Sequence, residues 1–248
     1  MRKKSESPDA ASQTARATLL LREMVIDGHF QPGEHIKEIP LSAKLGVSRI
    51  PLRLVLERLA HEGLLEIRPT RGFVVQQFSA TDIYDAIDLR GVLEGTAARL
   101  ASERLRDSRD LLPLQQSIEG MEALFQPRKL TLDAFTSYID LNARFHASLL
   151  DLSHSRILRR AIKHACSLPF ASPSAFLLKQ HFLADSRQLF MIALEHHREI
   201  LDAIANRESM RAETLAREHA RLARRNLDSA LQDRELLKSV RGVKLIEL

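Results

Sequence analysis

The chain comprises 248 residues, of which 44% are hydrophobic, 28% charged and 5% aromatic, and its formal net charge is +5. This apolar content is enough for a buried core and excludes a disordered protein, while the abundance of Leu, Ala, Arg and Glu favours helices over a β-sandwich. A single cysteine, and no apolar run near the roughly 20 residues that span a bilayer, exclude a disulfide scaffold and an integral membrane protein, so we expect a cytoplasmic chain.

Short elements separated by glycines fill the first part of the chain. Residues 1–12 are polar and predict a disordered tail. Amphipathic runs bounded by turn residues predict three helices, over 14–27, 41–45 and 48–62. Two β-branched runs predict a small hairpin, over 64–68 and 72–77. We therefore expect a winged helix-turn-helix domain over residues 13–79.

Long amphipathic stretches follow, and glycine becomes rare. They predict helices over 81–106, 109–124, 131–151, 154–167, 184–206 and 208–235. The fold class is therefore mainly α, with an all-helical antiparallel bundle over residues 80–235. Residues 236–248 form a C-terminal tail that the pattern does not place.

The third predicted helix has a divided surface. Leu52, Val55, Leu56 and Leu59 form an apolar stripe, and Ser48 stands where it can cap the helix. Arg49 and Arg53 are four residues apart and share the exposed face near the N-terminus, where a recognition helix meets the major groove. A solvated charged face without a partner is the alternative for two arginines alone.

The segment from Leu41 to Arg53, followed by Leu59 to Val74, resembles the winged helix-turn-helix of GntR-family regulators over about residues 14–77. The resemblance implies that operator DNA is contacted by Ser48, Arg49 and Arg53 and, from the wing, by Arg71 and Gly72. It gives Arg58 a phosphate-binding or structural role. Ile50 and Leu54 replace the family's usual Thr and Glu, so the operator sequence is expected to differ from the commonest sites.

Three histidines point inward on three different predicted helices. His146, His197 and His219 each lie on the apolar stripe of their helix, and Asn142 lies one turn before His146. A single inward histidine is usually a hydrogen-bonded core residue. Neutral imidazoles that converge from three helices are instead what a divalent metal site needs, and Asn142 could add a carbonyl oxygen.

The helical half resembles the FCD effector domain of the FadR-type subfamily of GntR regulators. The matching segments are Arg90–Glu94, Asn142–His146, Glu195–Leu201 and Glu218–His219. The resemblance implies a divalent metal, often Zn or Ni, bound by His146, His197, His219 and, at the position of the family's Asp, Asn142. It also implies a small carboxylate effector. Ser153–Ser155 replaces the family's Ser-Gly-Asn segment.

Arg90 lies on the core-facing stripe of its helix, where an unpaired charge would be costly. One interpretation is an internal ion pair with Glu94, one turn later. The other is that Arg90 binds the carboxylate of an effector.

These features predict a homodimeric, ligand-responsive regulator, a repressor of a metabolic operon that binds a palindromic operator. A metal-dependent hydrolase is the alternative, because three histidines and an open metal position can activate water. No acidic residue is clearly placed as its general base, and Cys166 is expected to be a helix-core residue rather than a nucleophile. A helical interaction module without a ligand would leave the histidines unexplained.

Overall fold

The computed structural model describes residues 8–125, 131–168, 170–174, 186–232, 237 and 242–247. The chain divides into two compact units, one formed by residues 1–80 with 241–248 and the other by residues 81–240. Among the described helices, none combines the length and the apolar character that crossing a membrane requires.

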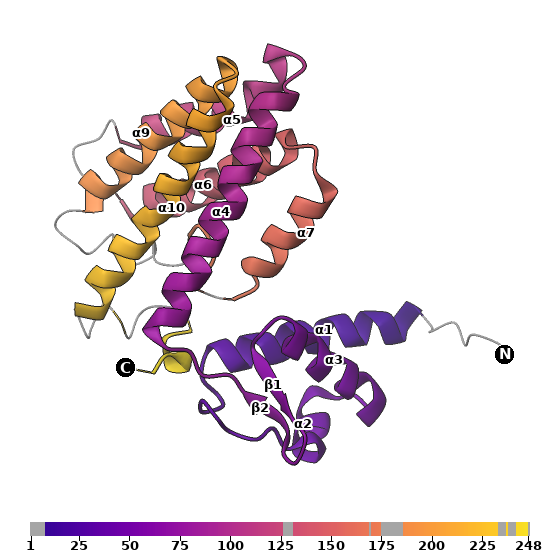
Figure 1. Cartoon of the computed structure of the whole chain (residues 1–248). Helices are drawn as coiled ribbons and strands as arrows, with labels where there is room; N and C mark the ends of the chain where they lie inside the picture. Colours follow the sequence, from indigo (N-terminus) through magenta and orange to yellow (C-terminus); the bar gives the residue numbers. More distant parts are fainter. Residues whose placement is uncertain are drawn as a thin grey trace. The chain divides into compact units, whose positions relative to one another are not determined.

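The first unit is three helices and a two-stranded sheet, as the winged helix-turn-helix pattern predicts (Figure 1). Its elements are α1 (Pro8–Ile26), α2 (Glu38–Leu45), α3 (Arg49–His61), β1 (Leu65–Arg68) and β2 (Gly72–Val75). The strands are antiparallel, with Leu65 opposite Val75 and Arg68 opposite Gly72. The predicted disordered tail is wrong for residues 8–12, which are helical, because Pro8 and the Ala-containing run after it suit a first helical turn.

The turn between α2 and α3 is closed by local hydrogen bonds. Gly46 has a φ of 65° in the left-handed region, and the Ser42 hydroxyl donates to the Val47 carbonyl over 2.6 Å. Ser48 occupies the N-cap position of α3, but its side chain makes no cap hydrogen bond, which corrects the expected capping role. The four residues of the predicted apolar stripe of α3 are all fully buried.

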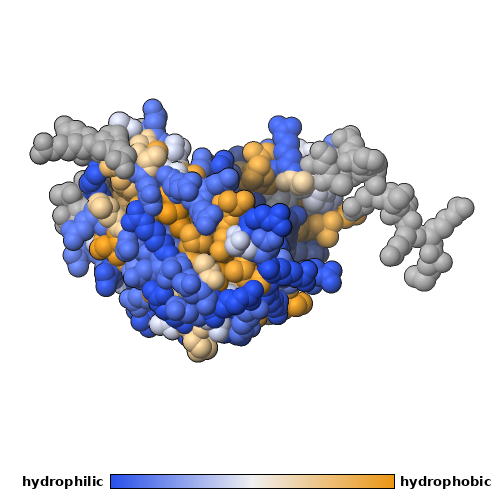
Figure 2. Space-filling view, turned by 90° about the horizontal axis from the view of Figure 1, so that it is seen from above, coloured by the Kyte–Doolittle hydropathy of each residue, from blue (hydrophilic) through white to orange (hydrophobic). Residues whose placement is uncertain are grey.

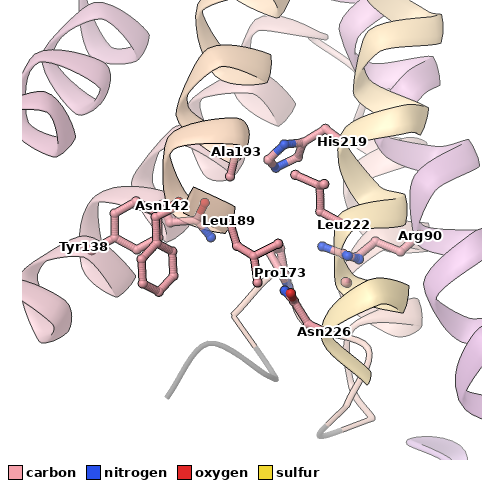
Figure 3. A pocket seen from close by; sticks show the side chains of 11 residues that line it. Arg90, Tyr138, Asn142, Pro173, Leu189, Ala193, His219, Leu222 and Asn226 are labelled. Atoms are coloured by element: carbon pink, nitrogen blue, oxygen red, sulfur yellow. The ribbon is translucent and has the colours of Figure 1, made fainter. Parts of the chain in front are cut away.

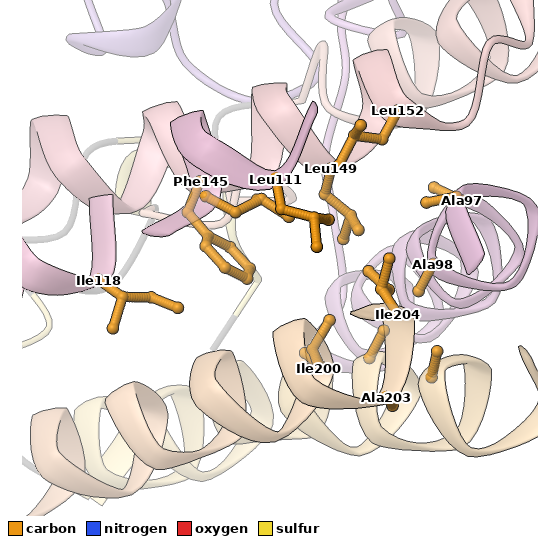
Figure 4. Close-up of a cluster of buried hydrophobic side chains, with 14 of the residues drawn as sticks. Ala97, Ala98, Leu111, Ile118, Phe145, Leu149, Leu152, Ile200, Ala203 and Ile204 are labelled. Carbon is orange, nitrogen blue, oxygen red and sulfur yellow. The ribbon is translucent and has the colours of Figure 1, made fainter. Parts of the chain in front are cut away.

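The second unit is all-helical among its described residues. Its elements are α4 (Ala80–Arg104), the 3-10 turn η1 (Ser108–Leu111), α5 (Leu112–Leu124), α6 (Leu132–Leu152), α7 (Arg156–Ala165), α9 (Ser186–Ala205) and α10 (Ser209–Gln232). Side chains from α4, α5, α6 and α9 converge on one apolar core (Figure 4). The face of the molecule in Figure 2 is mostly hydrophilic, with apolar residues gathered in a band across it. The mainly α fold class is confirmed.

Two glycines let α4 and α10 approach closely. A Cβ atom at Gly91 would lie 3.0 Å from the Ala220 Cβ, and one at Gly95 would lie 2.6 Å from the Arg217 Cγ. The two helices that carry Arg90 and His219 are therefore held side by side.

The C-terminal segment 242–247 belongs to the first unit. The Phe78 amide donates to the Leu245 carbonyl over 2.8 Å, and the Glu247 amide donates to the Phe78 carbonyl over 2.7 Å. Leu245 and Ile246 are buried. The segment 242–247 thus pairs with Phe78, shortly before the helical unit begins in sequence, an arrangement that the sequence pattern did not predict.

Candidate functional site

The N-terminal end of α3 is open to solvent. Ser48, Arg49 and Arg53 are all exposed, as the divided helix surface predicts. Arg53 lies 3.7 Å from Glu57, and its side chain is 69% exposed. A surface ion pair of this kind contributes little to the stability of the fold. Arg53 can therefore leave Glu57 and contact a DNA phosphate or base instead.

The wing presents a second cationic tip. Arg71 and Gly72 are exposed at the turn between β1 and β2. Gly72 has a φ of 67°, a left-handed conformation that is strained for residues with a Cβ atom. The turn is closed by the Arg71 amide, which donates to the Arg68 carbonyl over 3.1 Å.

Arg58 contacts Glu62 at 3.4 Å, and the same carboxylate accepts three hydrogen bonds from Arg22 on α1. The two expected roles of Arg58 are phosphate binding and a structural role. The contact with Glu62 supports the structural role. Ile50 and Leu54, the two departures from the family pattern, are 79% and 46% exposed. These apolar side chains lie on the surface of the recognition helix.

Three histidines from three helices meet inside the second unit. His146 on α6, His197 on α9 and His219 on α10 each offer a ring nitrogen within 4.8 Å of the others. The Nε2 atoms of His197 and His219 are 3.1 Å apart. Two imidazoles bound to one metal ion at about 2.1 Å lie about 3.0–3.4 Å apart, so this spacing suits shared ligands.

The environment favours the neutral form of two of these histidines. Burial, together with the positive charge of neighbouring histidines, holds the pKa of His197 and of His219 well below the ordinary value. Both Nδ1 atoms and the His146 Nε2 are buried without a hydrogen-bond partner, whereas the His146 Nδ1 lies close to the Glu94 carboxylate. Neutral imidazoles with unpartnered nitrogens fit a divalent cation.

A chain of close polar contacts connects the cluster to Arg90. The Glu94 Oε1 atom lies 3.6 Å from the Arg90 Nη1 and 3.2 Å from the His146 Nδ1. Burial opposes ionisation of Glu94, but Arg90 and His146 lower its pKa to about 2. The Arg90 side chain is 2% exposed, and its Nε has no partner. The predicted internal pair with Glu94 is thus present, and one guanidinium donor remains free for an anion.

A small polar pocket of about 30 Å³ adjoins the histidines (Figure 3). Arg90, His219 and Asn226 lie along one side of it, and Tyr138 and Asn142 along the other. The Asn142 Nδ2 donates to the Ser174 hydroxyl over 3.3 Å, which leaves the amide oxygen available. About 10–15 Å³ of such space holds one water molecule, so this pocket has room for two or three waters or for a small head group.

A second cavity, of about 360 Å³, is lined in part by His146. Aliphatic residues of α4, α6 and α7 form most of its lining, and the polar residues Glu94, His146, Ser172 and Ser174 also line it. Pro173 lines both cavities. Cys166 also lines this cavity, just beyond the end of α7, so the expectation of a helix-core cysteine is wrong: α7 ends before Cys166.

Sequence reasoning missed two parts of this arrangement. The contact of Glu94 with His146 joins two helices, so no periodicity within one helix could reveal it. The Asn226 Oδ1 is buried without a partner in the small pocket. Its place on the same stripe as His219 was the available signal.

Sequence profiles of two known families match the chain. The FCD domain matches residues 85–222, and the bacterial regulatory proteins of the gntR family match residues 13–75. The first match alone covers more than half of the chain.

Curated relatives and a solved structure resemble most of the chain. The uncharacterized HTH-type transcriptional regulator YdhC of Bacillus subtilis (strain 168) is 31% identical over 198 residues, which cover 79% of this chain and 83% of the relative. A probable D-xylose utilization operon transcriptional repressor of Paenarthrobacter nicotinovorans is 29% identical over 182 residues, which cover 73% of each chain. The solved structure of E. coli McbR/YncC shares the fold, with a TM-score of 0.56 at 21% identity, over 89% of this chain and 97% of that one.

These matches give no support to the hydrolase alternative, because both family profiles and the relatives are those of transcription regulators. The chain is therefore a DNA-binding transcriptional regulator of the GntR family, in the FadR-type subfamily that carries an FCD domain.

Proposed function

We propose that the chain is a cytoplasmic, homodimeric repressor of a metabolic operon, released from a palindromic operator by a small carboxylate. One relative is named as a probable transcriptional repressor of a D-xylose utilization operon, which supports repression rather than activation. The exposed Arg49, Arg53 and Arg71 support DNA contacts by α3 and by the wing. A dimer would present these arginines to two half-sites.

The convergence of three histidines from three helices is the observation that carries the effector-binding part of the proposal. His146, His197 and His219 would hold a divalent ion, Zn or Ni, and the Asn142 amide oxygen or water would complete its shell. Glu94, 3.2 Å from the His146 Nδ1, is suited to orient that ring. A bound ion would offer open coordination positions to a carboxylate.

Arg90 supplies a second contact for the effector. Its unpartnered Nε lies in the small pocket beside His219, so a carboxylate there would meet a guanidinium already oriented by Glu94. Arg90 is on α4, which begins directly after the wing in sequence. An acid that binds the DNA-competent and incompetent states unequally by about 1–3 kcal/mol would change operator affinity roughly 5- to 150-fold.

Metal analysis of purified protein tests the proposal. We expect about one equivalent of Zn or Ni per chain in the wild type and almost none in His197→Ala, because one of three imidazole ligands is lost. Asn142→Asp should bind the ion more tightly, since a carboxylate is a stronger ligand than an amide oxygen.

His164→Ala is the matched control, since this exposed histidine lies outside the cluster. Equal, near-zero metal in the wild type and in Asn142→Asp after incubation with Zn or Ni would mean that these are ordinary core histidines.

A further inference from the structure

The two cavities beside the histidine cluster differ in volume, and this difference limits which part of an effector each of them can hold. The pocket that contains Arg90 and His219 has a volume of about 30 Å³, too small for more than a head group. The cavity beside His146 has a volume of about 360 Å³. The bulk of any ligand at this cluster must therefore lie in the larger cavity.

The lining of the larger cavity is apolar along most of its length. Its aliphatic residues are Ala97, Ile139, Ala143, Ala147, Leu149, Leu150 and Ile162. A cavity of about 150 Å³ lined by such side chains holds one benzene molecule, so this one has room for a body of about two benzene rings. The small alanine side chains on α4 and α6 leave this space open.

The described lining of the cavity offers no cation that could pair with a second anionic group on the ligand. No Lys or Arg is among the described residues that line it, and the only acidic residue among them is Glu94, which contacts His146. A carboxylate far from the histidines would lose its hydration without gaining a cation. Ser172 and Ser174 are the only hydroxyl-bearing residues among the described lining, so a hydroxylated sugar acid would leave most of its hydroxyl groups against aliphatic side chains.

We propose that the effector is a monocarboxylate with an apolar body, whose carboxylate lies at the histidine cluster and whose body fills the cavity between α4, α6 and α7. This inference rests on the proposed acid-responsive function and narrows its ligand class. The inference predicts that medium-length fatty acids and aryl-substituted acids bind more tightly than short hydroxy acids and dicarboxylates.

Calorimetric titration with three acids tests the ligand class, with octanoate, butanoate and octanedioate as probes. Each buried methylene strengthens binding about fourfold, so octanoate should bind the wild type at least about tenfold more tightly than butanoate. Octanedioate has the same length but a second carboxylate, and should bind at least about tenfold more weakly than octanoate.

A cavity-filling variant locates the apolar body. Ala143 lines the cavity and is exposed, so Ala143→Leu should fold and yet weaken octanoate binding more than butanoate binding. Ala205→Leu is the matched control, because Ala205 is an exposed helical alanine that does not line the cavity. Equal binding of octanoate and octanedioate, or an Ala143→Leu variant that binds octanoate like wild type, would overturn the inference.

The single cysteine gives a separate readout of occupancy. Cys166 lines the cavity, and burial raises the pKa of its thiol to about 11, so alkylation is slow and is best followed near pH 9. Octanoate should protect Cys166 from iodoacetamide, and butanoate at equal occupancy should protect it less. Equal protection by the two acids would contradict the proposal.

Operator affinity separates this inference from the proposed function. A duplex selected from a random pool by the wild-type protein serves as the probe. If octanoate protects Cys166 but leaves the affinity for this duplex unchanged, the ligand class stands and the proposed switch fails. If short hydroxy acids change the affinity and octanoate does not bind, the switch stands and the ligand class is wrong.

Discussion

His197 is the most deeply buried of the clustered histidines, with no exposed surface and its ring centroid 4.1 Å from that of Phe145. An imidazole in this position cannot be protonated without leaving a charge among apolar side chains. His219 is under the same constraint at 8% exposure. The imidazoles of His197 and His219 are therefore kept in the neutral state that binds metals.

A pH dependence of stability follows for metal-free protein. The folded-state pKa values of His197 and His219 are lowered, so below about pH 6.5 the unfolded chain binds protons that the folded chain excludes. The melting temperature of the second unit should therefore fall as the pH is lowered from 7.5 to 5.5. His197→Gln removes one such group and should make the fall shallower.

Tyrosine fluorescence measures this transition selectively, because the two tyrosines of the chain, Tyr84 and Tyr138, both lie in the second unit and the chain has no Trp. An identical pH slope in wild type and His197→Gln would contradict the assigned protonation state.

At the residue level, helical periodicity was sufficient to predict which polar side chains turn inward. Arg90, Asn142, His197 and His219 are all buried, because one face of each amphipathic helix must pack against the core. Contacts between helices could not be predicted in this way. The 3.2 Å approach of Glu94 to His146 depends on how α4 packs against α6, which no single-helix pattern contains.

At the level of elements, most expected helices and the wing hairpin are present, but several helices begin or end at residues other than the expected ones. The helix expected over 41–45 begins earlier, at Glu38, and Pro40 is tolerated in its first turn. The helix expected over 109–124 is a 3-10 turn followed by α5. Ends depend on a few local hydrogen bonds, whereas a repeated apolar stripe fixes the existence of a helix.

The end of α6 carries backbone strain that a substitution should relieve. His154 follows the C-cap residue Ser153 and has a φ of 47°, where the family pattern has glycine. A left-handed conformation is costly for a residue with a Cβ atom, and the His154 side chain is exposed. His154→Gly should therefore raise the free energy of unfolding of the second unit by about 0.5–1 kcal/mol.

Urea unfolding followed by tyrosine fluorescence measures this change. His154→Ala is the control, because it removes the imidazole but keeps the Cβ atom and hence the strain. If His154→Ala stabilised the protein as much as His154→Gly does, the effect would come from the side chain and not from the backbone.

At the scale of the whole molecule, the chain passes between its two units at two points. It enters the helical unit after Phe78, and the segment 242–247 returns to pair with Phe78. The sequence predicted the first connection from the change in glycine spacing. It could not predict the second, because a short segment with one β-bridge and a 3-10 turn carries no periodic pattern.

Operator binding by the proposed dimer should depend steeply on salt. Two copies of Arg49, Arg53 and Arg71 offer six cations, and six phosphate contacts would give a slope of about −5 for log K against log salt concentration. If Arg53 contacts a base, its loss costs about 1–3 kcal/mol in each half-site, or at least about 30-fold in the affinity of a dimer. Arg49→Ala/Arg53→Ala should therefore weaken binding by at least this factor and flatten the salt slope.

The control for lost charge is Arg109→Ala/Arg211→Ala, which removes two exposed arginines from the helical unit. Fluorescence anisotropy with a labelled, selected duplex at several salt concentrations measures both affinity and slope. A general effect of net charge would weaken both double variants alike, because each loses the same charge. Contact by the recognition helix predicts that only Arg49→Ala/Arg53→Ala loses affinity for the selected duplex. Equal affinities of wild type and this variant would show that α3 does not read the operator.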